Sequence, residues 1–167
     1  MGSPAEDLLL VLQEQDATVA TAESLTGGKL AARITAVPGA STSFAGGVVS
    51  YMTDIKKRVL DVPEEIVTQH GVVSAECAVA MAEGVRRLLG TTYGVSTTGV
   101  AGPEPQEDKP VGTVFIAVAG PDRSVAYELA LPGDRFMIQE STVDRAVSVL
   151  REIIGSAGRQ PEEPALG

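Results

Sequence analysis

The sequence predicts a single α/β domain, a three-layer α/β/α sandwich around a mixed sheet. Helical and strand patterns alternate in the early part of the chain, and a hairpin pattern follows late, which is typical of this class. The 167 residues, of which 44% are hydrophobic, suffice for one domain with a sizeable core. No internal repeat and no long linker divides the chain. We expect the domain to span residues 1–154.

The first three elements are a helix, a strand and a helix. Residues 4–15 place apolar side chains on one helical face and begin with two carboxylates, as helices prefer. Residues 17–21 are rich in β-branched side chains and predict a strand. Residues 29–34 return to helical spacing, and the breaker Val37-Pro38-Gly39 ends that helix.

The next pair is a strand over residues 46–51 and a short helix over residues 53–60. The strand follows a flexible glycine pair. Thr53 and Asp54 are both good N-cap residues, so either one could begin the helix.

Two more helices and a strand follow. Residues 63–70 begin with proline and end before a glycine, which predicts a short helix. Residues 74–89 form a long amphipathic pattern, with Ser74 as the cap and Gly90 as the stop. Residues 93–98 then predict a short strand.

The last third holds a long loop, a hairpin and a helix. The loop over residues 99–110 is rich in glycine and proline, and its length indicates a functional loop. Residues 112–119 and 124–131 predict a β-hairpin. A final helix runs from about residue 134 to 154, and we expect residues 155–167 to form a disordered tail.

Composition excludes several classes of function. The net charge of −9 argues against a general nucleic-acid binder. A single cysteine, Cys77, rules out an intramolecular disulfide and is compatible with a reducing compartment. We expect no membrane span and no signal peptide. We also expect no myristoylation, since Glu6 stands where the myristoylation motif needs Ser or Thr. A cytoplasmic protein is the default expectation, and no residue cluster has metal-ligand spacing.

The stretch from Ala20 to Lys29 carries the strongest candidate for chemistry. Ser24 sits where a strand ends and a helix begins, and Gly27 and Gly28 allow backbone N–H groups to approach a ligand. A hydroxyl beside such donors could be a nucleophile next to its own oxyanion hole. The alternative is that Ser24 or Thr26 only caps the helix.

A serine nucleophile needs a base, and the sequence offers two kinds. His70 is the only histidine, but it stands at a helix end, where it would cap carbonyls or be solvated. In the run Lys56-Lys57-Arg58, mutual repulsion would lower the pKa of a lysine toward neutrality. Neighbours on a helix point about 100° apart, so only one of the two lysines can face the strand end at Tyr51. The alternative is a solvated basic face.

Three candidate residues stand at strand ends. Ser24, Tyr51 and Thr98 each follow or end a predicted strand, and ligands of α/β sheets bind at carboxyl ends of strands. We therefore expect one shared pocket. Arg135, which follows Gly133-Asp134, could bind a phosphate or carboxylate bidentately, or form a surface salt bridge.

Four stretches form an ordered set: Thr21–Gly28, Val49–Tyr51 followed by Lys56, Gly99–Pro103 and Lys109–Val114. Together they resemble the C-terminal domain of the competence/damage-inducible CinA proteins, whose stand-alone members are nicotinamide-nucleotide amidases called PncC. The resemblance covers the chain from about Leu8 to Ile154.

This resemblance implies an enzyme that hydrolyses the carboxamide of nicotinamide mononucleotide to nicotinate mononucleotide and ammonia. It implies no cofactor and no metal, a small-molecule nucleotide as substrate, and a homodimer or higher homo-oligomer. Ser24 is then the nucleophile and Lys56 the base, while Tyr51 orients groups or relays protons. The residues implied to contact the substrate are Gly27, Gly28, Thr98, Gly99 and Arg135.

One segment departs from the family pattern. Residues 103–108 replace a glycine-rich stretch and bring prolines and three carboxylates near the expected position of an anionic nucleotide. Two other functions therefore stay open. One is a catalytically lapsed domain that binds nucleotides or regulates, and the other is an interaction module in DNA-damage or competence pathways.

Overall fold

The computed structural model describes residues 2–158, which form six α-helices, five strands and one 3-10 turn. The order is α1 (Pro4–Glu14), β1 (Val19–Glu23), α2 (Lys29–Thr35), η1 (Ala40–Thr42), β2 (Phe44–Val49), α3 (Thr53–Leu60), α4 (Glu64–His70), α5 (Ala75–Leu89), β3 (Tyr93–Gly99), β4 (Thr113–Ala119), β5 (Ser124–Ala130) and α6 (Arg135–Ala157).

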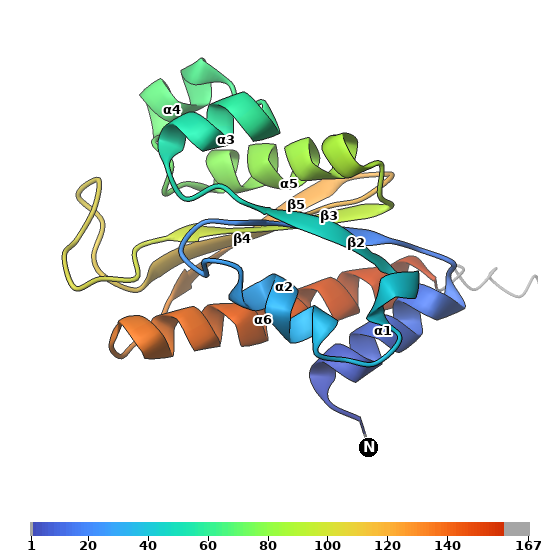
Figure 1. The fold of residues 1–167 in the computed structure, drawn as a ribbon. Coiled ribbons are helices and arrows are strands. Elements are labelled where there is room, and N and C mark those ends of the chain that lie inside the picture. Colours follow the sequence, from blue (N-terminus) through green and yellow to red (C-terminus); the bar gives the residue numbers. More distant parts are fainter. Residues whose placement is uncertain (1, 159–167) are drawn as a thin grey trace, which may run out of the picture.

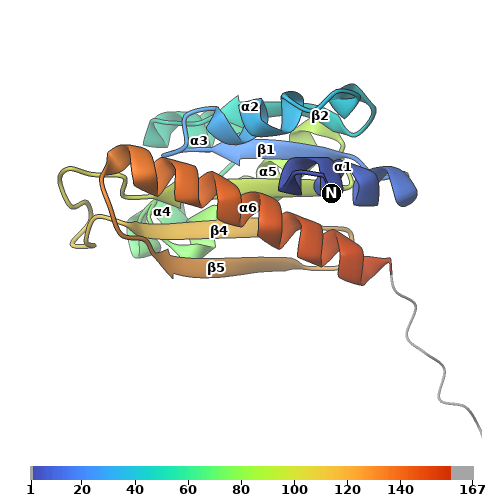
Figure 2. The same cartoon turned by 90° about the horizontal axis from the view of Figure 1, so that it is seen from below.

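The strands form one mixed sheet between two layers of helices, as predicted (Figure 1). The strand order is β2-β1-β3-β4-β5. β1 pairs in parallel with β2 and β3, whereas β4 pairs antiparallel with β3 and β5. In the parallel half, the carboxyl ends of β2, β1 and β3 therefore lie side by side at one end of the sheet. The long loop between β3 and β4 and the start of α6 lie at that same end of the molecule in both views (Figures 1 and 2).

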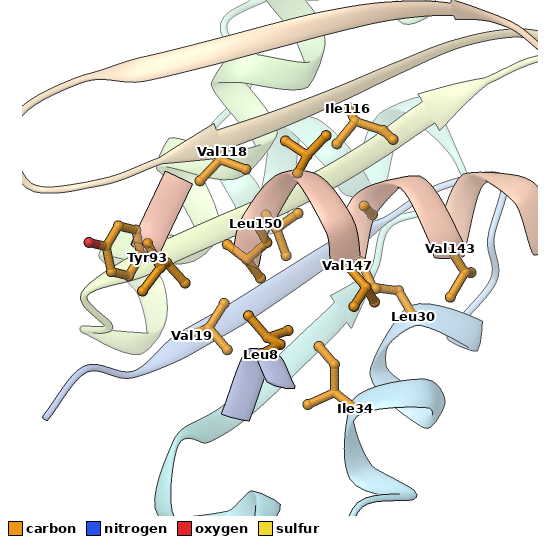
Figure 3. Close-up of a cluster of buried hydrophobic side chains, with 14 of the residues drawn as sticks. Leu8, Val19, Leu30, Ile34, Tyr93, Ile116, Val118, Val143, Val147 and Leu150 are labelled. Atoms are coloured by element: carbon orange, nitrogen blue, oxygen red, sulfur yellow. The ribbon is translucent and has the colours of Figure 1, made fainter. Parts of the chain in front are cut away.

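Helices α1, α2 and α6 cover one face of the sheet. Their apolar side chains pack with alternate residues of the strands in a fully buried cluster (Figure 3). Leu8, Leu30 and Leu150 come from the three helices, and Ile116 and Val118 come from β4. Branched aliphatic side chains fill this layer, as expected for a chain with few aromatic residues.

Helix α5 covers the other face, with α3 and α4 outside it (Figure 1). Small residues let α5 approach its neighbours closely. A methyl group on Gly94 would overlap the carbonyl of Ala82, and one on Gly84 would overlap that of Leu60. Ser96 Oγ donates to the carbonyl of Ala78 in α5. This close packing brings α3 near the end of β1.

Two of the parallel strands, β1 and β2, are shifted from their predicted positions. β1 spans residues 19–23 instead of 17–21, because its parallel register aligns Val19 with Tyr93 and Glu23 with Thr97. β2 spans residues 44–49 instead of 46–51, so Tyr51 lies in the connection to α3. The pairing with neighbouring strands sets where β1 and β2 end, and the residue pattern of one strand alone carries no information about that pairing.

Two helix ends also differ. The N-cap of α3 is Met52, whose side chain makes no capping bond, so Thr53 and Asp54 are not the caps. Helix α6 continues to Ala157, so the predicted disordered tail is wrong for residues 155–157. Residues 159–167 lie outside the described part of the chain. The other predicted elements agree with the structure to within a few residues at their ends.

None of the helices within residues 2–158 combines the length and the apolar character that crossing a membrane requires.

Candidate active site

The alternation of side chains along β1 places Ser24 beside the α3–α5 layer. Ala20 and Ala22 pack in the core under α5, and Ser24 follows them at the same two-residue spacing. Its backbone N–H donates to the carbonyl of Thr97 at 3.0 Å, which continues the pairing with β3 beyond the strand end. The hydroxyl of Ser24 is thus held on the layer that also carries Lys56.

Lys56 is the lysine that faces the nucleophile. It lies on the inner face of α3 with Leu60, one helical turn away, and is only 1% exposed. Its Nζ lies 2.9 Å from Ser24 Oγ. The same nitrogen lies 2.7 Å from the carbonyl oxygen of Ser50 and 3.2 Å from that of Tyr51. Sequence reasoning had no signal for the carbonyl of Ser50, because any residue type supplies one.

Lys56 can make these three contacts in either protonation state. An ammonium donates to all three oxygens, whereas a neutral amine donates to both carbonyls and accepts the hydroxyl proton of Ser24. Burial lowers the pKa of Lys56, and the nearby Cys77 and Glu107 oppose that shift. The structure therefore places an amine with a lowered pKa next to the Ser24 hydroxyl.

The other two candidate bases lie elsewhere. Lys57 Nζ binds Glu64 at 2.8 Å on the exposed side of α3. His70 ends α4 and lies near Glu76, with its Nδ1 3.7 Å from that carboxylate and its side chain 43% exposed. The tertiary structure thus selects Lys56 from the alternatives.

Glu23 is a buried residue of the site region that the sequence reasoning missed. Its Oε1 accepts from the Leu30 N–H at 2.8 Å and from the Thr26 hydroxyl at 2.6 Å, and its Oε2 accepts from the Ala31 N–H at 3.1 Å. It caps α2 from the preceding strand, so neither Ser24 nor Thr26 is the N-cap. The cap position itself is Gly28, with a left-handed backbone. A carboxylate in a buried strand just before a helix was the available signal.

Gly27 and Gly28 do not line the cavity, contrary to expectation. Gly27 is exposed, and its N–H donates to the carbonyl of Ser24 at 3.1 Å. By contrast, Leu25 follows the nucleophile and lines the cavity, and its N–H has no hydrogen-bond partner within residues 2–158. The free donor next to Ser24 is therefore the N–H of Leu25.

A cavity of about 530 Å³ opens in front of Ser24 and Lys56. This volume lies within the range of small-molecule sites. Its lining contains the predicted residues Tyr51, Thr98, Gly99 and Arg135. The segments that contribute are the ends of β1 and β3, the start of α3, the turn at residues 72–73, the loop after β3 and the start of α6.

The Tyr51 side chain lies away from the Ser24–Lys56 pair. Its hydroxyl accepts a hydrogen bond from Arg135 Nη2 at 2.8 Å, and the ring is exposed. Only its backbone carbonyl contacts Lys56. This geometry does not favour the expected proton relay. Arg135 also donates from Nη1 to the carbonyl of Gly102 at 2.6 Å, so it joins α6 to two walls of the cavity.

Thr98 lines the cavity, but its hydroxyl is already engaged. Thr98 Oγ1 donates to the carbonyl of Val72 at 2.7 Å. Thr98 thus holds the turn before α5 in place.

Of the carboxylates in the unusual segment 103–108, only Glu104 lines the cavity. Glu107 instead accepts hydrogen bonds from the N–H groups of Val72 and Val73. The charge in front of the site is therefore smaller than the sequence suggests. Asp54 and Glu104 are the two cavity carboxylates, against Arg135 and Lys56.

Within residues 2–158, no group of three or more His, Cys, Asp or Glu side chains is arranged to hold a metal ion.

Comparison with known proteins supplies the family. The CinA C-terminal domain family matches residues 2–154. A CinA-like protein of Frankia casuarinae is 52% identical over 147 residues, which are 88% of this chain and 34% of that protein. A putative competence-damage inducible protein of Geobacillus is 45% identical over 88% of this chain and 36% of its own length. The chain thus spans about a third of these curated relatives.

Solved structures agree with this match. The structure of a CinA superfamily protein of Klebsiella pneumoniae aligns with a TM-score of 0.89 and 30% identity, covering 93% of this chain and 99% of that one. The competence/damage inducible protein CihA of Agrobacterium tumefaciens aligns with a TM-score of 0.84 and 30% identity, covering 93% and 97%.

Proposed function

The chain belongs to the CinA C-terminal domain family, and from this premise we propose that it is a nicotinamide mononucleotide amidohydrolase. The observation that carries the proposal is the 2.9 Å contact between Ser24 Oγ and the buried amine of Lys56. A serine hydroxyl beside a neutral lysine is the arrangement that nucleophilic amide cleavage needs.

In the proposed reaction, Ser24 Oγ attacks the carboxamide carbon while Lys56 Nζ takes the hydroxyl proton. The C–N bond then breaks, and Lys56 returns the proton to the leaving nitrogen, which departs as ammonia. A water molecule attacks the resulting ester, with Lys56 as the base again, and Ser24 regains its proton as nicotinate mononucleotide leaves. The balance is one amide and one water for one carboxylic acid and one ammonia.

The reaction also needs a hydrogen-bond donor to the oxyanion and a group that binds the substrate phosphate. The free N–H of Leu25 is the candidate donor to the oxyanion, in place of Gly27 and Gly28. Arg135 uses two of its N–H donors within the protein, and a guanidinium has five, so it can also bind a phosphate.

The test is ammonia release from nicotinamide mononucleotide, with nicotinate mononucleotide measured by chromatography. We expect turnover by the wild type and a loss of about 10³-fold or more in Ser24→Ala, because the nucleophile is removed. Ser41→Ala is the matched control, since Ser41 is exposed and its side chain makes no hydrogen bond within the described residues. A folded wild type that releases no ammonia would contradict the proposal, and an active Ser24→Ala would contradict the nucleophile.

A second candidate is a lapsed domain that binds nucleotides without cleaving them. The observation that favours it is that segment 103–108 departs from the family pattern and places Glu104 in the cavity wall. Calorimetric binding of the intact nucleotide with no turnover would support this alternative over the amidase.

A further inference from the structure

The turn at Val72 and Val73 has all four of its backbone polar groups bonded to side chains from elsewhere in the chain. The N–H groups of Val72 and Val73 donate to the two carboxylate oxygens of Glu107, at 2.9 and 3.0 Å. The carbonyl of Val72 accepts from Thr98 Oγ1, and that of Val73 accepts from Lys109 Nζ. The long loop after β3 is therefore fastened to this turn by Glu107 and Lys109.

Both sides of the contact are shaped for a carboxylate. Gly71 has φ of +77°, and a methyl group there would overlap Glu107 Oε2. On the loop side, Glu107 and Asp108 have φ of +53° and +58°, between Gln106 and Lys109, which exchange backbone hydrogen bonds. Residues with a Cβ adopt this left-handed turn at a cost, so contacts elsewhere must hold it.

The two fastened segments are both cavity walls. Val72 and Val73 line the cavity on one side of the contact, and Gly102, Glu104 and Gln106 line it from the loop. Arg135 joins the same loop to α6 through the carbonyl of Gly102. Releasing Glu107 would remove both bonds to the N–H groups of the turn and leave Lys109 as the one loop side chain, within the described residues, that still bonds to it.

We propose that Glu107 is a positioning residue: its carboxylate fastens the loop of residues 100–112 to the Val72–Val73 turn and so holds the substrate cavity in its binding shape. The kinetic part of this inference rests on the proposed amidase function. The contact itself does not, because it is a property of the fold. We call the contact between Glu107 and the N–H groups of Val72 and Val73 the latch.

The carboxylate of Glu107 also affects the pKa of Lys56, the proposed base. Glu107 and Cys77 both raise the pKa of Lys56 against the effect of burial. The remaining titratable groups that line the cavity are Tyr51, Asp54, Glu104 and Arg135. Removing the charge of Glu107 favours the neutral amine, so the acidic limb of the pH–rate profile moves to lower pH.

The test compares Glu107→Gln with Asp108→Asn. Each variant removes one negative charge from the same turn, and both residues are exposed and lie outside the cavity lining. They differ in that Glu107 binds Val72 and Val73, whereas Asp108 makes no side-chain hydrogen bond or ion pair within residues 2–158. In Glu107→Gln we expect KM for nicotinamide mononucleotide to rise about tenfold with a smaller change in kcat, because the wall is no longer pre-organised. We expect Asp108→Asn to stay within about twofold of the wild type in both constants.

Two further measurements do not depend on turnover. Amide hydrogen exchange at Val72 and Val73 is expected to be at least about tenfold faster in Glu107→Gln, because both N–H groups lose a charged acceptor. An NMR titration of the Lys56 amine should give a lower pKa in Glu107→Gln than in Asp108→Asn.

Equal KM, equal exchange and an equal Lys56 pKa in the two variants would overturn the latch. A wild type without amidase activity would contradict the proposed function alone. In that case faster exchange and a lowered Lys56 pKa in Glu107→Gln would still support the latch, and unchanged values would overturn it as well.

Discussion

The amine of Lys56 is buried away from water and contacts three protein oxygen atoms instead. Desolvation is the largest effect on its pKa and lowers it. Cys77 opposes this only when ionised, and burial raises the pKa of that thiol to about 11. Near neutral pH the thiol is therefore uncharged, and Glu107 is the charge that opposes the shift. The fold thus lowers the pKa of a side chain that is normally a cation at neutral pH, as the proposed base requires.

This pKa predicts a pH dependence for the proposed reaction. The active form has a neutral Lys56, so kcat/KM should fall as pH drops through the lowered pKa, on a limb that lies below 10.5. The linkage to stability has the same sign. Between the lowered pKa and 10.5, the unfolded chain binds more protons at this residue, so its contribution to stability increases with pH. A pH–rate profile with a limb at or above 10.5 would contradict the buried base.

Substitution of Lys56 by arginine tests the base while keeping a long basic side chain at this position. A guanidinium stays protonated at all relevant pH values and cannot accept the Ser24 proton. We expect Lys56→Arg to lose about 10²–10⁴-fold in kcat, measured by ammonia release.

Lys57→Met is the positional control for that experiment. Lys57 is the next residue on α3, but it binds Glu64 at the surface. Its loss is expected to leave kcat within about twofold. The opposite ranking of the two variants would show that the wrong lysine had been assigned.

Among the elements, the turn from β1 to α2 is held by a side chain from the strand. Helix α2 begins at a glycine that has no side chain to cap it, and Glu23 binds the second and third N–H groups of the helix. Because Glu23 directly precedes Ser24, the cap also fixes the backbone that carries the nucleophile. Thr26 ties this cap to β3, since its hydroxyl lies 2.8 Å from that of Thr97.

Glu23→Gln tests the cap at the level of stability. The side chain keeps its size but loses charge, and one of its accepting atoms becomes a donor. We expect a loss of about 1–3 kcal/mol in the free energy of unfolding, measured in urea. The control is Glu128→Gln, an exposed carboxylate on the edge strand β5, which should stay within about 0.5 kcal/mol of the wild type. Equal stabilities for the two variants would exclude the capping role.

At the scale of the whole molecule, the site lies where the layers meet. Ser24 and Thr98 lie at the carboxyl ends of the parallel strands, and α3 and α6 reach this end of the sheet from opposite faces. Each face contributes one basic side chain, Lys56 from α3 and Arg135 from α6. The cavity therefore depends on both helical layers.

The family resemblance predicts a homodimer or higher homo-oligomer, and the surface offers apolar side chains for it. Five exposed large apolar residues cluster in sequence around the cavity segments: Val49, Tyr51, Met52, Phe136 and Met137. Light scattering at micromolar concentration should give at least twice the mass of one chain. We expect Phe136→Glu to lower that mass and Leu10→Glu, on the exposed side of α1, to leave it unchanged. A monomeric wild type would contradict this prediction.

Most of the fold could be predicted from local patterns. Apolar spacing, glycine stops and cap residues such as Ser74 and Asp134 located nearly every element, because these signals act within a few residues. The ends of β1 and β2 were wrong, because cross-strand register sets them. The role of Glu23 was missed, because its partners are seven and eight residues away.

For the site too, part could be predicted from the sequence and part depends on the tertiary structure. By itself, the sequence determined the candidates: a hydroxyl after a strand, a pair of lysines after the next strand and a glycine-rich loop. Only the tertiary structure decided among them, because proximity depends on how distant segments pack. It brought Lys56 to Ser24 across 32 positions of the chain and left Lys57 at the surface. It also lined the cavity with Leu25, whose N–H is free, instead of with Gly27 and Gly28. Burial then lowered the pKa of Lys56, and burial exists only in the folded chain.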